Sequence, residues 1–378
     1  MPNGAPRGAV FISTTRRRSR GLPPRWAQRR IRHRQAGAAT ARQGGCYVDI
    51  FLQQIINGLT LGSIYALVAL GYTMVYGIIG LINFAHGEVV MIGAMVALSV
   101  ITGLLGAYGS LPAVVIILAG LFVAILVCIA IAYGMEKIAY RPLRRAPRLA
   151  PLITAIGMSI ILQNVALMVW GRNYRTFPTL IQPTPHNVLG ASMTDLQMLI
   201  VVLAGLLMGG LVLIVQRTRL GMAMRATAQN PQVAGLMGID INVIISAAFI
   251  IGAALAAVAG LMVMAYYGIA HYYMGFLLGL KAFTAAVLGG IGNLAGAMLG
   301  GILLGIIEAL GAGYIGDVTN VCGLSSLSDT LQQQCAANDG QVSLFGSNYQ
   351  DVFAFFVLIL VLIFRPSGLL GEKVADRA

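Results

Sequence analysis

Apolar residues run along this chain in long stretches rather than alternating with polar ones. The clearest stretch, from Gln53 to Met95, holds 43 predominantly apolar residues and is interrupted at Asn83-Phe84-Ala85-His86-Gly87-Glu88. The hydrocarbon core of a bilayer is about 30 Å thick and takes about 20 helical residues to cross. The stretch therefore predicts two membrane passages, with the break between or within them.

The break predicts a protected site. Backbone polar groups in lipid must be satisfied internally, so an interrupted helix at membrane depth persists only where protein or a water-filled cavity surrounds it. Asn83 is expected to cap a new helix, and Glu88 to lie in its first turn, where the helix dipole favours a carboxylate by about 0.3–1 kcal/mol. Glu88 stays open between that role and a contact with a transport path or another subunit. His86 and Glu88 do not share a helix face, so we expect no pairing between them.

Later apolar segments predict the remaining passages. Residues 281–314 are interrupted by glycines, and we interpret Gly289, Gly290 and Gly292 as a required backbone break. Two short passages or a re-entrant hairpin fit this length; two passages are favoured, because they bring Arg365 into the cytoplasm. The other expected passages are Leu111–Ile131, Leu149–Trp170, Leu196–Val215, Ile241–Met264 and Val352–Phe364. The pattern predicts an all-α polytopic membrane protein of about 8–10 transmembrane helices with broken or re-entrant segments.

Arginines indicate which loops are cytoplasmic, because cytoplasmic loops carry an excess of basic residues. One such loop contains Arg141, Arg144, Arg145 and Arg148, and another spans Arg217–Asp240. The polar segment Gly171–Asp195 is then expected outside.

Composition supports the membrane class. Of the 378 residues, 58% are hydrophobic and 10% are charged, and the mean hydropathy is +0.83, whereas soluble domains have about 25% charged residues. Continuous rather than alternating apolar runs exclude a transmembrane β-barrel.

The net charge of +13 belongs to the N-terminal segment. Eleven of the 25 basic residues and none of the 12 acidic ones precede Cys46. Residues 1–47 therefore predict a basic, disordered tail rather than a nucleic-acid-binding surface. The tail lacks the apolar stretch of a secretory signal, although its arginines are also compatible with a transit peptide. We expect the native protein to start at Val48, read as Met from a GTG codon, with the tail arising from a misassigned gene start.

The cysteines predict one disulfide. Cys322 and Cys335 both lie in the polar loop 316–349, which is assigned to the outside. Oxidising compartments support disulfides, so a Cys322–Cys335 bridge is expected.

Catalytic chemistry is not supported. A P-loop needs Gly-Lys-Ser/Thr to hold phosphates, and none of Lys137, Lys281 and Lys373 stands in that context. The four histidines are too scattered for a zinc-protease motif, so the chain is not expected to be an enzyme, to hold a metal or to need a cofactor.

Polar side chains expected at membrane depth are candidates for a transport path. A charge at the centre of a span costs about 2.5–3.5 kcal/mol on insertion scales, so such groups should face protein or water. A helix–helix hydrogen bond is the alternative role for each amide. The polar residues are Asn57, Asn83, His86, Glu88, Gln163, Asn164, Asn293 and Glu308. We assign Asn83, His86, Glu88, Asn293 and Glu308 to the path.

The cytoplasmic loop RTRLGMAMRATAQNPQVAGLMGID offers two helical arrangements. Residues Arg225–Met237 form one short helix with Gly238 as its stop, or Pro231 restarts a helix in its first turn. A short helix rich in small residues suits docking into a groove on a partner. An ordinary solvated connector is the other interpretation.

Three blocks carry a family resemblance: QQIINGLTLGSIYALVALGYTMVYGIIGLINFAHGE, RATAQNPQVAGLMGID and AVLGGIGNLAGAMLGGILLG. Together they resemble the LivH-type permeases of branched-chain amino acid ABC importers. The resemblance covers Val48 to Gly371, so that 48–371 is the transmembrane permease domain and 372–378 a short cytoplasmic tail. The basic tail and the long loop 316–349 depart from the family pattern.

The resemblance implies that the cytoplasmic loop is the coupling segment docked on the ATPase subunit. The loop lacks the leading Glu of the family's motif, so Ala234 and Gly238 carry over best. The implied coupling residues are Arg225, Ala226, Ala228, Asn230, Pro231, Ala234, Gly235 and Gly238.

The implied function is that of a permease subunit in the bacterial inner membrane, working by alternating access. The implied partners are a second permease subunit (a homologue or another copy), two cytoplasmic ATPase subunits, an extracytoplasmic substrate-binding protein and membrane lipid. Urea or short amides are alternative substrates within the family. An ion-coupled secondary transporter using Glu88 or Glu308 is an alternative from another class, as is a channel.

Overall fold

The computed structural model describes residues 25–108, 111–144, 146–147, 149–180, 184–188, 190–318, 349–365 and 367–371. The chain divides into two units, Met1–Val48 and Asp49–Ala378. The expected Cys322–Cys335 bridge lies outside the described residues.

The first helix begins earlier than composition suggested. Helix α1 runs from Arg25 to Ile79, so the disorder expected for residues 1–47 does not hold from Arg25 onward. Alanine, arginine and glutamine are abundant in this segment and are good helix formers, which outweighs the low hydrophobicity on which the expectation rested.

Seven helices of the described residues are long and apolar enough to cross a membrane. They are α1 from Asp49, α2 (His86–Ala107), α3 (Ala113–Met135) with the π-helical turn η1 (Glu136–Tyr140), α4 (Leu149–Trp170), α5 (Asp195–Arg217), α8 (Ile241–Tyr267) and α10 (Leu294–Val318). Two shorter apolar helices are α9 (Met274–Gly289) and α12 (Gln350–Phe364). These helices confirm the expected all-α polytopic class.

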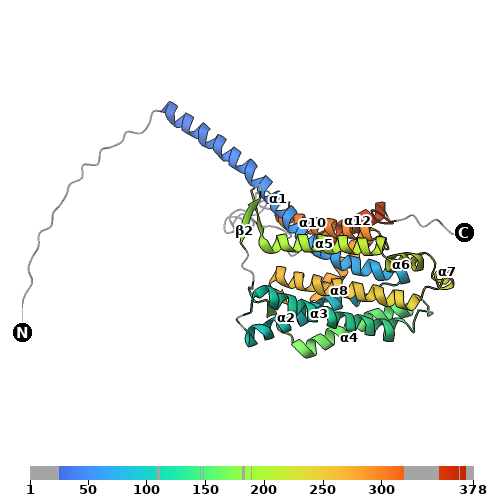
Figure 1. The fold of residues 1–378 in the computed structure, drawn as a ribbon. Coiled ribbons are helices and arrows are strands. Elements are labelled where there is room, and N and C mark those ends of the chain that lie inside the picture. The colour runs from blue at the N-terminus through green and yellow to red at the C-terminus, as the bar shows by residue number, and fades with distance from the viewer. Residues whose placement is uncertain are drawn as a thin grey trace, which may run out of the picture. The chain divides into compact units, whose positions relative to one another are not determined.

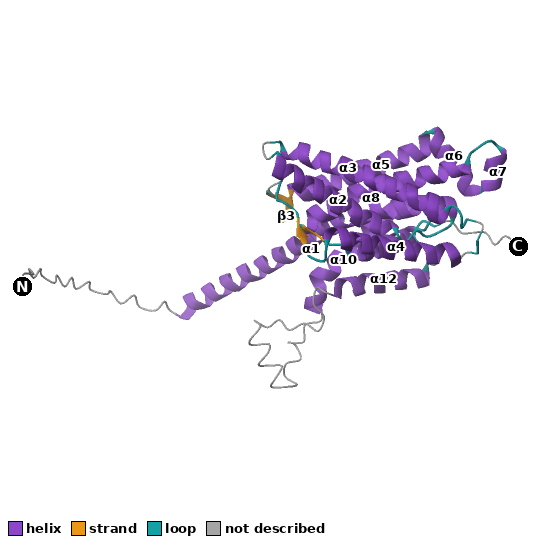
Figure 2. Ribbon diagram, turned by 90° about the horizontal axis from the view of Figure 1, so that it is seen from below, coloured by secondary structure: helices purple, strands orange, loops and turns teal. Residues whose placement is uncertain are grey.

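The non-membrane elements lie at opposite ends of the helices (Figures 1 and 2). At one end, β1 (Arg175–Thr176) pairs with β4 (Ile269–Ala270), and β2 (Pro185–Val188) pairs with β3 (Ala191–Thr194), both antiparallel. At the other end lie α6 (Arg219–Gln229) and α7 (Pro231–Leu236). The arginine-rich loop thus lies opposite the proline-containing segment, as the positive-inside rule predicts.

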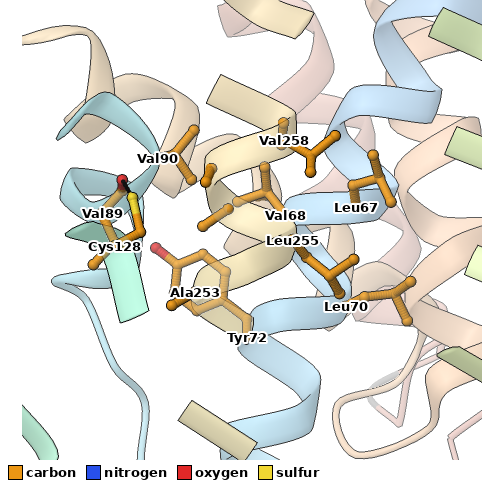
Figure 3. Packing of buried hydrophobic residues seen from close by; sticks show 14 of the residues in the cluster. Leu67, Val68, Leu70, Tyr72, Val89, Val90, Cys128, Ala253, Leu255 and Val258 are labelled. Atoms are coloured by element: carbon orange, nitrogen blue, oxygen red, sulfur yellow. Dashed lines mark hydrogen bonds between the residues drawn. The ribbon is translucent and has the colours of Figure 1, made fainter. Parts of the chain in front are cut away.

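The helices form an inner and an outer set. The most apolar part of α1 is 83% buried and that of α8 is 67% buried, whereas the corresponding parts of α3, α4 and α5 are 22–28% buried. Residues of α1, α2, α3 and α8 meet in the core, where the Cys128 thiol donates to the backbone oxygen of Val89 at 3.4 Å (Figure 3). The exposed apolar faces of α3, α4 and α5 are suited to contact lipid.

Glycines bring α1 and α10 into direct backbone contact. Gly58 and Gly62 on α1 face Gly301 and Gly305 on α10, and a Cβ on any of the four would collide with the backbone of the other helix. Both pairs have the spacing Gly-x-x-x-Gly, which lets transmembrane helices approach closely.

The break between α1 and α2 is folded into the protein. Helix α1 ends at Ile79, and α2 begins at His86 without a side-chain cap. The expectation that Asn83 caps this helix is wrong: Asn83 is buried, and its side-chain oxygen accepts a hydrogen bond from the Tyr140 hydroxyl at 2.7 Å. Because the break is away from solvent, the buried amide needs a tertiary partner.

The helix contact predicts that Gly305→Val destabilises the protein. Overpacking costs about 1–3 kcal/mol in well-packed cores, and here the obstacle is backbone, which has little room to move. We expect a lower unfolding temperature of the detergent-solubilised protein. Gly209→Val on α5 is the matched control, because nothing lies within 4 Å of a Cβ built there. Equal unfolding temperatures for the two variants would contradict the close contact.

Candidate transport and coupling sites

The cytoplasmic loop contains two helices rather than one. The side-chain oxygen of Asn230 accepts hydrogen bonds from the backbone N–H groups of Gln232 and Val233, at 3.0 and 3.2 Å. Pro231 takes the first position of α7, where its missing N–H leaves no bond unmade. A single helix over Arg225–Met237 is therefore wrong, and the restart at Pro231 is confirmed.

Helix α7 turns one apolar face inward and another outward. Ala234 is 3% exposed, whereas Leu236 and Met237 are 87% and 78% exposed, with Val233 also exposed. Gly238 ends the helix with a positive φ of 85°. Among the expected coupling residues, Arg225, Ala228, Asn230, Pro231, Gly235 and Gly238 are exposed and Ala226 is half-buried.

Sequence reasoning missed the outward apolar face. It selected Ala234, whose side chain packs inward, and passed over Val233, Leu236 and Met237. The available signal was the presence of three large apolar residues in a polar, arginine-containing loop, since such exposed apolar groups mark interaction surfaces.

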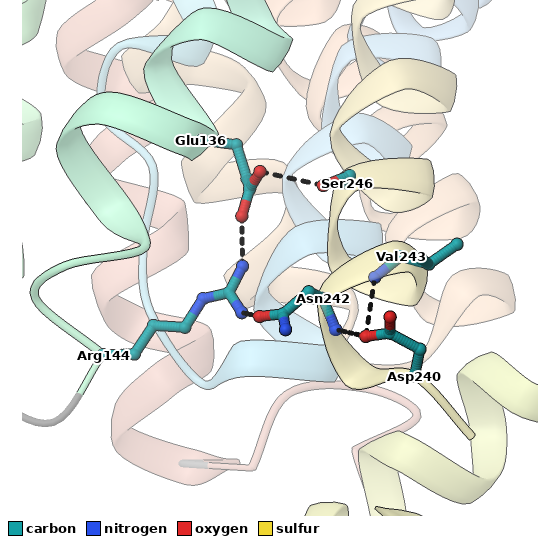
Figure 4. A network of polar contacts seen from close by, with 6 residues as sticks. All are labelled: Glu136, Arg144, Asp240, Asn242, Val243 and Ser246. Carbon is teal, nitrogen blue, oxygen red and sulfur yellow. Dashed lines mark hydrogen bonds and ion pairs between the residues drawn. The ribbon is translucent and has the colours of Figure 1, made fainter. Parts of the chain in front are cut away.

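A polar network ties this cytoplasmic end together (Figure 4). The buried carboxylate of Glu136 forms an ion pair with Arg144 and accepts a hydrogen bond from the Ser246 hydroxyl at 2.8 Å. Arg144 also donates to the side-chain oxygen of Asn242 at 2.8 Å. Burial lowers the pKa of the Arg144 guanidinium, and the adjacent Glu136 carboxylate opposes that shift. The network joins η1 to the first turns of α8, where Asp240 caps the helix.

His86 and Glu88 face different neighbours, as expected from their spacing. The His86 ring packs edge-on against Tyr72 of α1, with ring centroids 4.9 Å apart. A Cβ at Gly71 would overlap the His86 ring, so a glycine is needed there. His86 is therefore a packing residue between α1 and α2.

Glu88 contacts α4 instead. One of its carboxylate oxygens accepts hydrogen bonds from Gln163 Nε2 at 2.7 Å and from Ser159 Oγ at 3.2 Å. The other oxygen, Oε2, is buried without a hydrogen-bond partner among the described residues. Both donors are neutral, so within the described part of the chain the carboxylate has polar contacts and no cation.

A cavity of about 370 Å³ adjoins this group. Ser159 and Gln163 line it, while aromatic and aliphatic residues form most of its wall. The lining residues are Tyr72, Phe84, Ile156, Ser159, Ile160, Gln163, Tyr273, Phe276, Gly279 and Leu280. The volume lies within the range of about 300–1,000 Å³ typical of small-molecule sites.

Glu308 lies in a separate ion cluster. Lys281 on α9 is 2.7 Å from Glu308 on α10 and 2.7 Å from Asp351 on α12, and its amine is 3.5 Å from the Tyr65 hydroxyl. Sequence reasoning did not assign Lys281, because nothing local links it to residues 27 and 70 positions away. Lys281 thus joins α9 to α10 and α12, with Glu308 as its partner on α10. A role of Glu308 in the transport path stays a prediction.

Asn293 caps a helix. Its side-chain oxygen accepts from the backbone N–H of Gly296 at 3.2 Å, and its amide donates to the Leu370 carbonyl at 2.9 Å. A role of Asn293 in the transport path stays a prediction. The neighbouring break has α9 ending at Gly289 and positive φ angles of 108° at Gly290 and 95° at Gly292.

A family model and several known proteins that resemble this chain point to the same family. A family model described as "Branched-chain amino acid transport system / permease component" matches residues 54–362. The high-affinity branched-chain amino acid transport system permease protein BraD of Pseudomonas aeruginosa is 46% identical over 334 residues, covering 86% of this chain and 98% of BraD. The permease protein LivH of the corresponding Escherichia coli K12 system is 42% identical over 331 residues, covering 86% of this chain and 97% of LivH.

A more distant relative is the probable branched-chain amino acid transport permease protein LivH of Methanocaldococcus jannaschii, 26% identical over 329 residues, covering 85% of this chain and 94% of that protein. No solved structure matches the chain. The relatives are transport permeases and not enzymes, in agreement with the missing catalytic motifs.

The network at the cytoplasmic end predicts a non-additive effect. Arg144→Leu leaves the buried Glu136 carboxylate without its cation. Removing one partner of a fully buried pair lowers the stability by about 3–5 kcal/mol. Because Arg144 is partly hydrated, we expect a loss of stability near or below the lower end of that range. Adding Glu136→Gln removes the stranded charge and should restore part of the loss. Thermal unfolding of the single and double variants measures the coupling. Additive losses would show that the pair does not act as a unit.

Proposed function

The chain belongs to the family of permease components of branched-chain amino acid transport systems, and from this premise we propose that it is a transmembrane subunit of an ABC importer. In this proposal it carries branched-chain amino acids across the bacterial inner membrane. Its relatives in Pseudomonas and Escherichia are named for high-affinity transport of these substrates, and they align over nearly their whole length.

The observation that best supports an ABC subunit is the outward apolar face of α7. Val233, Leu236 and Met237 lie exposed at the arginine-rich end of the protein, on a short helix that suits helix-in-groove docking. The chain has no Gly-Lys-Ser/Thr sequence to hold a nucleotide. Two separate ATPase subunits would supply the energy, with a second permease subunit and an extracytoplasmic binding protein completing the importer.

Coupling would pass from α7 into the membrane through two successive contacts. The backbone N–H of Ile239 donates to the Ala234 carbonyl, which connects α7 directly to the start of α8. Asn242, in the first turn of α8, connects in turn to Arg144 and Glu136 at the end of α3. Movement of α7 with a closing ATPase would therefore tilt α8 and α3 together, as rocking of rigid helices in alternating access requires.

The cavity favours a substrate with an apolar side chain over urea. Ile156, Ile160, Phe276 and Leu280 form its aliphatic and aromatic wall, which a small polar amide would leave unfilled. An ion-coupled transporter that uses Glu308 is less well supported, because this buried carboxylate already has Lys281 as its counterion.

Uptake tests the substrate class. Vesicles containing the chain with its neighbouring subunits and binding protein are expected to take up labelled leucine in an ATP-dependent manner, and not labelled urea. Leucine uptake without any ATPase subunit would contradict the importer, and uptake of urea in place of leucine would contradict the substrate.

Docking predicts that Leu236→Asp releases the ATPase subunits. Truncating or charging a central apolar anchor typically costs about 2 kcal/mol or more, enough to weaken the contact more than tenfold. We expect the variant to lose co-purifying ATPase and most leucine uptake while its unfolding temperature stays unchanged. The control is Val188→Asp, which places the same charge at an exposed position of the strand β2. Full retention of ATPase by the Leu236 variant would exclude α7 as the docking helix.

A further inference from the structure

The described part of the chain contains three glutamates that are each 1% exposed: Glu88, Glu136 and Glu308. Arg144 pairs with Glu136, and Lys281 pairs with Glu308. Glu88 has no cationic partner among the described residues. It is thus the one member of this set whose charge the described structure leaves uncompensated.

A buried carboxylate in this state is costly. Removing an ion from water is repaid only by a well-placed opposite charge and by hydrogen bonds to its remaining lone pairs. Ser159 and Gln163 satisfy one oxygen of Glu88, and they leave Oε2 without a partner. An ammonium group provides what is lacking, because it carries three donors and a positive charge.

The surroundings of Glu88 give such a group a place to bind. Ser159 and Gln163, its two hydrogen-bond donors, line the cavity, and α2 packs against both α4 and α9 around it. Oε2 lies on the α9 side, where a Cβ built on Gly275 would come within 2.7 Å of it. Glycine at position 275 thus keeps a side chain of α9 away from the carboxylate. Gly279 lines the cavity, and a Cβ there would meet the Tyr72 hydroxyl and the backbone of Gly87 instead.

We propose that Glu88, Ser159 and Gln163 form a site in the permease that holds the ammonium group of an apolar amino acid during its passage. The inference rests on the proposed function and deepens it by naming the substrate group that is recognised. Gln163 and Ser159 orient the carboxylate, and the ammonium neutralises it from the cavity side.

The remaining wall of the cavity fits the rest of such a substrate. Ile156, Ile160, Phe276 and Leu280 offer an apolar surface for a branched side chain. Tyr273 also lines the cavity, and a tyrosine hydroxyl can donate to the substrate carboxylate. None of the residues that line the cavity in the described structure is basic, so the site selects for the ammonium rather than for the carboxylate.

The test uses Glu88→Gln in the complete complex of permease and ATPase subunits. The substitution keeps the size of the side chain and an oxygen that accepts from Ser159 and Gln163, and it removes the charge. We expect leucine uptake to fall at least tenfold, while Glu88→Asp, which retains the charge, recovers part of it. A purely structural role would instead show as a lower unfolding temperature of the Gln variant.

Binding is measured directly as the rise in unfolding temperature that a ligand produces in the complex without its binding protein, since a ligand of the native state stabilises it. Leucine and leucinamide, which both carry the ammonium, are expected to raise this temperature. 4-Methylpentanoate, which is leucine without its amino group, is expected to leave it unchanged.

Two variants on neighbouring residues provide a matched control. Gln163→Leu removes a donor to Glu88 and should abolish the leucine-dependent rise. Asn164→Leu removes an amide of the same size that bonds only to the backbone of its own helix among the described residues, and the rise should remain.

The outcomes separate this inference from the function on which it rests. If the wild-type complex does not transport leucine, the proposed substrate is wrong. If the wild type transports leucine and Glu88→Gln transports it equally well, the ammonium site is wrong. Three results of the unfolding measurement also overturn the ammonium site. Leucine fails to raise the unfolding temperature of the wild type, leucine raises that of the Glu88→Gln variant, or 4-methylpentanoate raises that of the wild type as much as leucine does.

Discussion

The cost of an uncompensated charge in a buried, low-dielectric setting explains much of this permease. Each buried glutamate occupies a different structural position because of the partner it needs. Glu136 finds Arg144 and joins η1 to α8 at the cytoplasmic end. Glu308 finds Lys281 and joins α9 to α10, with Asp351 adding α12. Glu88 has only neutral donors among the described residues, and both donors line a cavity. This difference is the basis of the proposed ammonium site.

The need to hydrogen-bond backbone N–H and C=O groups is the second constraint, and it determines where α2 begins beside the cavity. A chain that breaks its helix inside the membrane must enclose the exposed peptide groups in protein. In the segment between α1 and α2, the backbone N–H of Gly80 donates to the Tyr76 carbonyl and that of His86 to the Asn83 carbonyl, while the Asn83 side chain pairs with Tyr140. This arrangement lets α2 begin beside α4 and α9. Glu88, in the first turn of α2, is thereby brought to the centre of the helical body rather than to its surface.

The sequence predicted the features that depend on local composition, and not those that depend on tertiary partners. Apolar stretches of about 20 residues are enough to locate spans, and the Asn-Pro pair at 230–231 was enough to suggest a restarted helix. The cap expected at Asn83 was wrong, and the contacts of Asn293 and Glu308 were not foreseen, because their partners Tyr140, Leu370 and Lys281 are distant along the chain. The outward face of α7 was missed because a helix of one and a half turns has too short a pattern to show which side packs. Helix propensity outweighed composition from Arg25 onward.

The account's central claim is that the substrate binds in a cavity beside Glu88 and that the ATPase subunits dock on α7. The most direct measurement is a structure of the whole complex, with its ATPase subunits and with leucine. The account predicts the leucine nitrogen within hydrogen-bond distance of the Glu88 carboxylate, its side chain against Ile156, Ile160 or Phe276, and Leu236 and Met237 covered by an ATPase subunit. Leucine bound elsewhere in the membrane, with the cavity filled by side chains and α7 still exposed, would contradict it.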